Sequence, residues 1–415
     1  MSKLAYWGGA RVCRASFKGW PIWSEDDKAS VNRLIESEGW GQLRGTEVKA
    51  FSQELGDFLG AKYVVPCSSG TAALEAQLKA VGVSAGDEVI VPSYTCFATA
   101  TPIFNLRAIP VIVDVDPETY TMDAEKAAAA ITVRTKAIVP VHLYSGMADL
   151  DQICTIGADN AIPVIEDAAQ ATGSKWRQVS AGLHGVSGSF SFQESKILTA
   201  GEGGAIITDD ASIFGFCMEY VNCGRPSESS KSHAGVFGTN FRMSGIQAAL
   251  LRSQLQHFRT QIEIRQSNAR VLDTGLNAIP GISALAYFSK RQTTRTFYKY
   301  IFKLQEEILE QVTRAQFIAA LEAEGVPCRS LFVPLNRDPL LPFEAIDWLP
   351  KVGRGSAQWY RSLNFPVAER AAYKEAVGLW HPLLLGSEND MHGIIEAVAK
   401  VSENLAEVKM IGQEP

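Results

Sequence analysis

The sequence predicts an α/β protein, with a mostly parallel central sheet covered by helices on both faces and a smaller C-terminal α+β domain. Between about residues 60 and 210, short runs rich in Val and Ile alternate with Ala- and Leu-rich stretches. These runs lack polar alternation, which is typical of strands buried on both faces of a sheet. Strands that alternate with helices indicate parallel pairing through right-handed crossovers. After about residue 210 the alternation ends, so a different unit follows.

The individual elements follow in chain order from these patterns. Expected strands cover residues 63–66, 88–92, 111–113, 137–141 and 163–165, and expected helices cover residues 71–81, 97–106 and 211–222. A long helix is predicted over residues 246–268, because its apolar residues recur at spacings that place them on one face. These apolar residues are Ile246, Leu250, Leu251, Leu255 and Phe258.

The C-terminal third has its own pattern, with an expected strand at residues 297–304 and expected helices at 314–324 and 389–408. We therefore divide the chain into a large domain over residues 1–275 and a small domain over residues 276–415. Residues 1–30 carry three tryptophans and little regular pattern, so they are expected to form an N-terminal arm against another surface.

The composition limits the class of protein. The chain has 415 residues, of which 46% are hydrophobic and 20% are charged, and these fractions fit a soluble globular protein. Its formal net charge of −6 disfavours binding to nucleic acid or to an anionic membrane. The longest apolar runs fall short of the ~18 residues of a transmembrane helix, and the N-terminus is too short for a signal peptide.

The cysteines and histidines indicate neither disulfides nor a metal site. Seven scattered cysteines without Cys-x-x-Cys spacing favour a reducing cytoplasm. The six histidines show no His-x-x-x-His spacing, so no metal is expected. His142 and His381 are interpreted as hydrogen-bonded structural histidines, since partial burial is normal for this residue type.

Candidate site residues follow the predicted strands, because ligands bind at the carboxyl ends of parallel strands. Residues 67–71 read Cys-Ser-Ser-Gly-Thr and lead into a helix. The free N–H groups and the positive dipole end of a helix N-terminus suit a phosphate. A capped helix after a turn explains the same residues without any ligand.

An acidic pair and a lysine follow later strands. Glu166 and Asp167 end the fifth predicted strand, where a carboxylate could hold a protonated ring nitrogen or could cap a helix. Lys196 follows a Ser- and Phe-rich strand and precedes the Gly-rich residues 201–204. Most lysines are solvated surface groups, but a partly desolvated lysine forms a Schiff base with an aldehyde.

Together and in this order, these motifs resemble the DegT/StrS-type sugar aminotransferases, a family of fold type I pyridoxal phosphate enzymes. The lysine stands 29 residues after the aspartate (196 − 167). The similarity runs from about Leu4 to the C-terminal helix. Its clearest stretches are residues 69–74, 87–92, 166–170, 189–192 with Lys196, 201–204, and 240–243 with 247–249.

The resemblance implies a role for each matching residue. Lys196 would carry pyridoxal 5′-phosphate as a Schiff base and later move the proton of the reaction. Asp167 would pair with the pyridinium nitrogen and keep it protonated. Gln170 would lie near the phenolic oxygen of the cofactor.

The resemblance also implies how the phosphate is held and how the chain assembles. Gly70, Thr71 and Ser191 would bind the phosphate within one subunit. Asn240 matches the family position that reaches the phosphate of the neighbouring subunit, so the resemblance implies a homodimer with shared active sites.

Three positions depart from the family pattern. The aromatic residue that usually stacks on the cofactor ring is replaced by Cys96, with Phe97 next, so the stacking residue is left unassigned. Asn336 stands where many sugar-nucleotide members carry a histidine, and Gly245 replaces a common acidic residue. Loop variation and a functional change explain Asn336 and Gly245 equally well.

The predicted activity is transamination of a keto-cyclitol or keto-sugar, with glutamine or glutamate as donor, in aminosugar or secondary-metabolite biosynthesis. Residues 140–149, 365–369 and 383–386 resemble the glutamine-dependent scyllo-inosose aminotransferases. An enzyme similar to the aminohydroxybenzoate synthases, a dehydratase and a regulatory pyridoxal-phosphate-binding protein are the alternatives; the presence of Lys196 favours transamination. The sequence shows no cluster of basic residues that could bind a nucleotide diphosphate. Arg225, Arg242 and Arg329 are available to bind the carboxylate of an amino donor.

Overall fold

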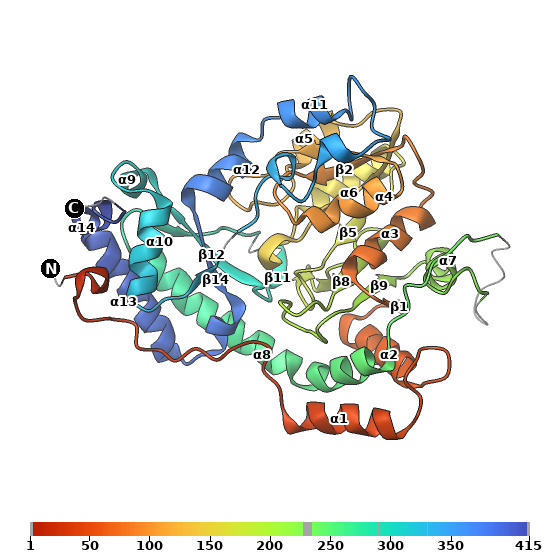
Figure 1. The fold of residues 1–415 in the computed structure, drawn as a ribbon, viewed down its shortest axis with the longest axis horizontal. Helices are drawn as coiled ribbons and strands as arrows, with labels where there is room; N and C mark the ends of the chain where they lie inside the picture. The colour runs from red at the N-terminus through yellow and green to blue at the C-terminus, as the bar shows by residue number, and fades with distance from the viewer. Residues whose placement is uncertain (1–2, 227–234, 289, 330, 413–415) are drawn as a thin grey trace.

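The computed structural model describes residues 3–226, 235–288, 290–329 and 331–412. Figure 1 shows a large sheet-containing part and a smaller part, with the long helix α8 (Gly245–Asn277) running from one to the other. Leu251 and Phe258 of α8 lie in the core of the large part, and Leu272 and Leu276 lie in the core of the small part. One helix therefore belongs to both hydrophobic cores.

The central sheet is mostly parallel, as predicted. One group of strands has the order β3 (Ile109–Val113), β2 (Glu88–Pro92), β4 (Thr135–Ile138), and its pairings are parallel. The other has the order β1 (Tyr63–Cys67), β9 (Gly204–Thr208), β8 (Ser187–Ser191), β5 (Ile165–Asp167). Parallel bridges from Ile138 to Val164 and from Val141 to Asp167 join the groups. Strand β9 pairs antiparallel with both of its neighbours.

Helices cover both faces of this sheet, which also confirms the prediction. On one face, Val65 and Ile206 pack against α3 (Gly70–Ala80) and α7 (Ala211–Val221). On the other face, Val64 and Ile207 pack with α2 (Glu47–Leu59) and α8. The remaining helices of the large part are α1 (Glu25–Glu36), α4 (Thr101–Asn105), α5 (Ala124–Ala129) and α6 (Leu150–Asp159).

The small part contains an antiparallel sheet with the order β10 (Ile282–Ala284), β12 (Lys299–Leu304), β14 (Ala376–Trp380), β13 (Cys328–Arg329). Its helices are α9 (Glu306–Leu309), α10 (Arg314–Ala323), α13 (Glu388–Glu403) and α14 (Leu405–Lys409). Leu4 and Cys13 of the N-terminal segment are buried in the core of this part. In Figure 1 the red N-terminal segment runs along the small part before it reaches α1.

A long excursion of the C-terminal third returns to the large sheet. Leu335, Phe343 and Tyr360 are buried in the core of the large part, and α11 (Ala357–Ser362) and α12 (Pro366–Arg370) lie along this excursion. A short sheet of β11 (Gln292–Thr294), β6 (Lys175–Trp176) and β7 (Val179–Ser180) also links residues from both halves of the chain. No helix in the described ranges is long and apolar enough to cross a membrane.

Several boundaries differ from the predictions. Strand β5 begins at Ile165 rather than at Pro163, and Val164 forms only an isolated parallel bridge to Ile138. Strand β12 begins at Lys299, because Phe297 has a positive φ of 56° that no strand residue adopts. The C-terminal helix is interrupted at Asn404. Ile246, which was grouped with the apolar helix face, is 45% exposed.

Candidate active site

A pocket of about 400 Å³ lies at the carboxyl ends of β1, β5 and β8. It brings together residues that are far apart in the sequence. The predicted site residues that line it are Gly70, Thr71, Asp167, Gln170, Ser191 and Lys196. Asn240, the remaining predicted site residue, is exposed and does not line this pocket.

The N-terminus of α3 has a side-chain cap and also has backbone N–H groups that remain unpaired. The Ser69 hydroxyl accepts a hydrogen bond of 3.1 Å from the Ala72 backbone N–H. The N–H groups of Gly70 and Thr71 find no acceptor within the described ranges, so they are left for a ligand. A Cβ at Gly70 would lie 2.8 Å from the Cβ of Ser191, so only glycine lets the helix start approach the strand end this closely. The capped helix expected from the sequence is therefore present, and its first turn also has free N–H donors.

Asp167 is held in one orientation at the floor of the pocket. Its Oδ2 accepts a hydrogen bond of 2.8 Å from the Thr99 hydroxyl, and its Oδ1 accepts one of 3.1 Å from the Ala169 N–H. Thr99 in turn lies 3.0 Å from the Thr95 hydroxyl. Sequence reasoning missed both threonines, although two hydroxyl residues in the segment after a parallel strand were an available signal.

A buried polar network stands behind this aspartate. Glu166 is fully buried and accepts hydrogen bonds from the N–H groups of Gly182, His184 and Gly185, at 2.7 to 2.8 Å. His142 Nε2 lies 2.8 Å from Glu166 Oε2, the oxygen that also accepts from Gly182. Burial opposes ionisation of Glu166, but these hydrogen bonds and the neighbouring histidines bring its pKa below the ordinary value.

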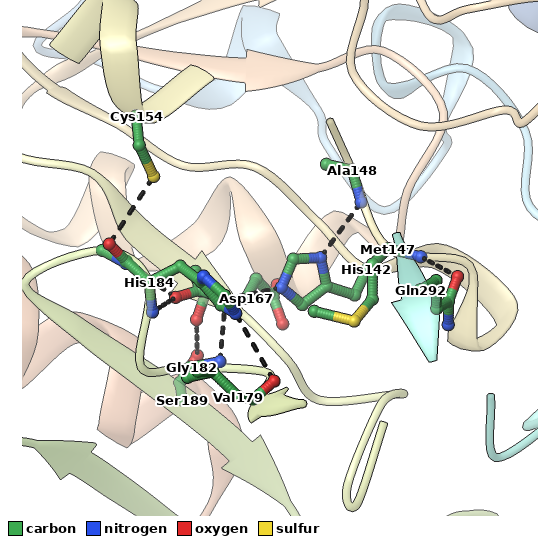
Figure 2. A network of polar contacts seen from close by, with 12 residues as sticks. His142, Met147, Ala148, Cys154, Asp167, Val179, Gly182, His184, Ser189 and Gln292 are labelled. Carbon is green, nitrogen blue, oxygen red and sulfur yellow. Dashed lines mark hydrogen bonds and ion pairs between the residues drawn. The ribbon is translucent and has the colours of Figure 1, made fainter. Parts of the chain in front are cut away.

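Figure 2 shows how these groups gather around the segment that carries Asp167, with His142 on one side and the backbone of Gly182 and His184 on the other. The Nδ1 atom of His142 accepts a hydrogen bond of 3.3 Å from the Ala148 N–H. His142 has partners at both nitrogens and does not line the pocket. The structure thus favours the interpretation of His142 as a structural histidine.

Gln170 is oriented by the loop after β4. Its Oε1 accepts a hydrogen bond of 3.0 Å from the Tyr144 N–H, and its carbonyl oxygen accepts one of 2.6 Å from the Ser145 hydroxyl. The side-chain amide nitrogen has no acceptor within the described ranges and is left to face a ligand. Tyr144 and Ser145 have positive φ angles of 52° and 69°, so this loop is strained where it meets the site.

Lys196 lies over an aromatic ring in the pocket. Its Nζ stands 4.5 Å from the ring centroid of Tyr298, a distance at which a cation is attracted to the face of the ring. The Tyr298 hydroxyl lies 2.9 Å from the Ser195 hydroxyl, so the ring is tied to the residue before the lysine. Tyr298 comes from the segment before β12, and no motif near Lys196 predicted it.

The charge of the pocket is low. Its charged lining residues are Asp167, Lys196 and Glu202. Arg225 is exposed, and Arg242 donates a hydrogen bond of 3.1 Å to the Asn222 side chain; neither lines the pocket. The Arg329 side chain lies outside the part of the chain that the structure describes.

The three departures from the family pattern have different outcomes. Cys96 and Phe97 both line the pocket, so either can approach a ligand ring. Asn336 is buried and donates a hydrogen bond of 2.7 Å to the Leu363 carbonyl, away from the pocket. A Cβ at Gly245 would lie 2.8 Å from the Trp40 carbonyl oxygen, so packing explains this glycine.

Comparison with known families gives a match over residues 21–368 to the DegT/DnrJ/EryC1/StrS aminotransferase family. The chain belongs to this family. It is 37% identical to an L-glutamine:2-deoxy-scyllo-inosose aminotransferase of Streptomyces lividus, over 98% of this chain and 99% of the relative. It is 36% identical to the enzyme of the same name from Micromonospora echinospora, over 99% and 100% of the two chains.

A similar solved structure is that of 3-amino-5-hydroxybenzoic acid synthase, with 31% identity and a TM-score of 0.83. The match covers 93% of this chain and 98% of that chain. The predicted fold type I architecture is confirmed, and the chain is an aminotransferase with pyridoxal 5′-phosphate as its cofactor.

The pocket fits this cofactor chemically. The unpaired N–H groups at the start of α3 suit a phosphate, because they combine free donors with the positive end of the helix dipole. A side chain at Gly70 would meet Ser191, so glycine lets these donors lie directly against the end of β8. An ordered carboxylate and a lysine amine line the same pocket.

Proposed function

We propose that this aminotransferase transfers the amino group of glutamine to a neutral, hydroxyl-rich cyclic ketone of the keto-cyclitol class. The observation that carries the proposal is the lining of the pocket, in which Lys196 is the cation that the described residues supply. A nucleotide diphosphate would need further cations to pair with its charges. The hydroxyl and amide groups of Thr95, Ser195 and Gln193 suit a polyol instead. The relatives that act on 2-deoxy-scyllo-inosose by name support the same class.

The roles of the individual residues belong to this proposal. When bound, pyridoxal 5′-phosphate supplies an electron sink that stabilises negative charge next to the transferred amine. Lys196 would hold the cofactor through Nζ, and its amine would remove a proton from the donor carbon that bears the amine and, in the second half-reaction, supply one to the acceptor carbon. Asp167, fixed by Thr99, keeps the ring nitrogen protonated through its negative charge. Gln170 donates from its amide nitrogen to the phenolic oxygen.

The phosphate end is held by a separate set of groups. The N–H groups of Gly70 and Thr71 and the Ser191 hydroxyl line the pocket and would donate to the phosphate oxygens. These donors sit on α3 and β8, two packed elements of the large part, so the phosphate position is rigid. A phosphate held there would leave the rest of the cofactor to extend into the pocket that Asp167 also lines.

We also propose a homodimer with shared active sites, in which Asn240 reaches the phosphate bound by the second subunit. Asn240 is exposed in the single chain, and Phe237 next to it is 97% exposed. Trp40 and Ile246 are 54% and 45% exposed, and they lie close together because the Gly245 N–H donates to the Trp40 carbonyl. An apolar surface of this kind fits a second copy of the chain.

All seven cysteines are free thiols, which fits a cytoplasmic enzyme.

A half-reaction screen tests the substrate class. The purified enzyme is first converted to its aminated form with glutamine, and scyllo-inosose, a keto-sugar nucleotide and a cyclic keto acid are then added separately. We expect fast return of the original cofactor absorbance with scyllo-inosose alone. Fast return only with the sugar nucleotide or only with the keto acid would contradict the substrate class and leave the aminotransferase activity intact.

The dimer has its own test. Light scattering should give twice the chain mass, and Asn240→Ala should weaken cofactor retention without changing that mass. A fully active monomer would contradict the shared site. Arg225→Ala, a change at another exposed residue of the same region, serves as the control for a general surface effect.

A further inference from the structure

A buried arginine near the lysine loop has no carboxylate partner among the residues that the structure describes. Arg265 on α8 is 0% exposed, and its Nε and Nη1 atoms have no hydrogen-bond partner within the described ranges. Its Nη2 lies 3.3 Å from Gln261 Oε1 and 3.3 Å from His381 Nδ1. Burial lowers the pKa of Arg265 to about 9. The burial of this charge requires an explanation, because burying an unpaired ion is strongly unfavourable in free energy.

The arginine fixes the direction of a hydrogen-bonded chain. A guanidinium group has only donors, so His381 Nδ1 must accept from Arg265. The proton of the neutral ring therefore sits on Nε2, which lies 3.1 Å from the Ser195 carbonyl oxygen and donates to it. Burial and the adjacent positive charge lower the pKa of His381 well below its ordinary value, so the ring stays neutral. In the opposite tautomer, two acceptors would face each other at Ser195.

The end of this chain is the peptide group that leads into Lys196. The carbonyl that accepts from His381 belongs to the residue directly before the lysine. The His381 ring also stacks on the Tyr298 ring, with centroids 6.1 Å apart, and Lys196 Nζ lies over that Tyr298 ring. His381 thus contacts both the backbone before the lysine and the ring beneath its amine.

The N-terminal arm packs against the same group of residues. The Trp20 indole donates a hydrogen bond of 2.9 Å to the Glu194 carbonyl. Its ring meets His381 edge-on, with centroids 4.5 Å apart, and the Arg265 guanidinium lies 5.7 Å from it. Residues from α8, from the segment after β14 and from the arm therefore converge on the loop that carries Lys196.

We propose that Arg265 and His381 are positioning residues for Lys196. Arg265 sets the tautomer of His381, and His381 holds the Ser195 carbonyl so that the lysine enters the pocket in one orientation. This inference rests on the proposed role of Lys196 as the residue that binds the cofactor. Neither residue lines the pocket, so both act through the lysine loop rather than on a ligand.

The test measures attachment of the cofactor rather than turnover. Full-length enzyme stripped of cofactor is mixed with pyridoxal 5′-phosphate, reduced with borohydride at timed intervals, and analysed by mass spectrometry for labelled Lys196. We expect His381→Leu to slow labelling roughly five- to tenfold, the effect of about one lost hydrogen bond. His381→Gln, which keeps a donor near the Nε2 position, should stay within about threefold of wild type.

One control variant separates positioning from general damage. Leu321→Ala removes a buried side chain of α10 in the core of the small part, so it should destabilise that part and still label at the wild-type rate. If His381→Leu also labels at the wild-type rate, the positioning role is wrong. If wild type labels another lysine instead, the proposed role of Lys196 is wrong, and the two failures are thus distinguishable.

A double-mutant cycle tests whether Arg265 acts through His381. Arg265→Met should slow labelling in the wild-type background and add nothing in the His381→Leu background, since its only route to the lysine is then gone. Arg265→Lys retains a charged donor and should recover part of the rate. Independent, multiplying effects of the two changes would overturn the proposed order of action.

Discussion

Two buried histidines stand behind the pocket, one next to Asp167 and the other next to Lys196, and they differ in the charge that accompanies them. Beside Asp167, His142 contacts the carboxylate of Glu166 at 2.8 Å. That carboxylate also accepts three backbone N–H groups, so its charge is compensated on every side. This region is a fully satisfied buried polar network.

The region behind Lys196 contains a buried positive charge instead of a negative one, and that charge has far fewer hydrogen-bond partners. His381 receives a hydrogen bond from Arg265, whose other nitrogens lack partners within the described part of the chain. The two histidines use the same tautomer, because each Nδ1 atom faces an N–H donor. The first network thus stabilises the fold around an acid, whereas the second buries an unpaired charge, at an energetic cost, to orient a lysine.

The largest expected effect is the loss of Lys196 itself, which should exceed the effect of losing any residue that positions it. Lys196→Ala should lower turnover by more than about 10⁴-fold, since it removes both the covalent attachment and the proton carrier. The fold should persist, which circular dichroism and thermal unfolding would verify. Lys49→Ala, at an exposed lysine on α2, is the matched control. Turnover near the wild-type rate in Lys196→Ala would refute the role of this residue.

Asp167→Asn tests the role of the negative charge of Asp167. The variant keeps the shape and the contact with Thr99 but loses the negative charge, so we expect turnover to fall by about 10²–10³-fold. Cofactor should also be lost during gel filtration, as measured by absorbance. Thr99→Val, which removes only the hydrogen bond, should have a clearly smaller effect. Equal losses in the two variants would mean that orientation matters more than charge.

The sequence predicted those site residues that follow strands along the chain. Gly70, Asp167 and Lys196 come directly after β1, within β5 and after β8, and parallel strands bring such positions to one edge. Tyr298 and His381 were not predicted as site residues, because they arrive from the small part by tertiary packing. His381 lies 186 positions from the Ser195 carbonyl that it contacts.

The fold was predictable where the periodicity was unbroken and less so at its edges. The apolar spacing that predicted a helix over residues 246–268 continues through Leu272 and Leu276, and α8 accordingly runs to Asn277. By contrast, the positive φ of Phe297 shortens a strand that hydropathy alone would extend. The return of residues 335–376 to the large core depends on long-range contacts that no local pattern encodes.

Stability measurements sharpen the contrast between the two networks. Glu166→Gln replaces an acceptor by an amide that faces N–H donors, so the free energy of unfolding should fall by about 1–3 kcal/mol. Arg265→Met removes a buried, unpaired charge, so this free energy should stay level or rise. Urea unfolding of both variants gives the comparison. An equal loss in Arg265→Met would show that its guanidinium has stabilising partners and would erase the contrast.

The smallest effect is the pH dependence that His381 gives to stability. Burial and Arg265 lower its pKa well below 6.5 in the folded chain, whereas in the unfolded chain it titrates near 6.5. Below that pH the unfolded state binds more protons than the folded state, so stability is full above pH 6.5 and falls as the pH decreases toward the folded pKa.

Between pH of about 7.5 and 5.5, this group should contribute a loss of about 1 kcal/mol in the free energy of unfolding. His381→Gln cannot take up the proton, so its unfolding free energy should depend less on pH by that amount. His392→Gln, at a histidine that is 55% exposed, is the control and should leave the wild-type slope unchanged. An unchanged slope in His381→Gln would mean that the folded His381 ring binds a proton as readily as the unfolded one. In that case Arg265 would not be holding the ring in the neutral form that points its N–H at the lysine loop.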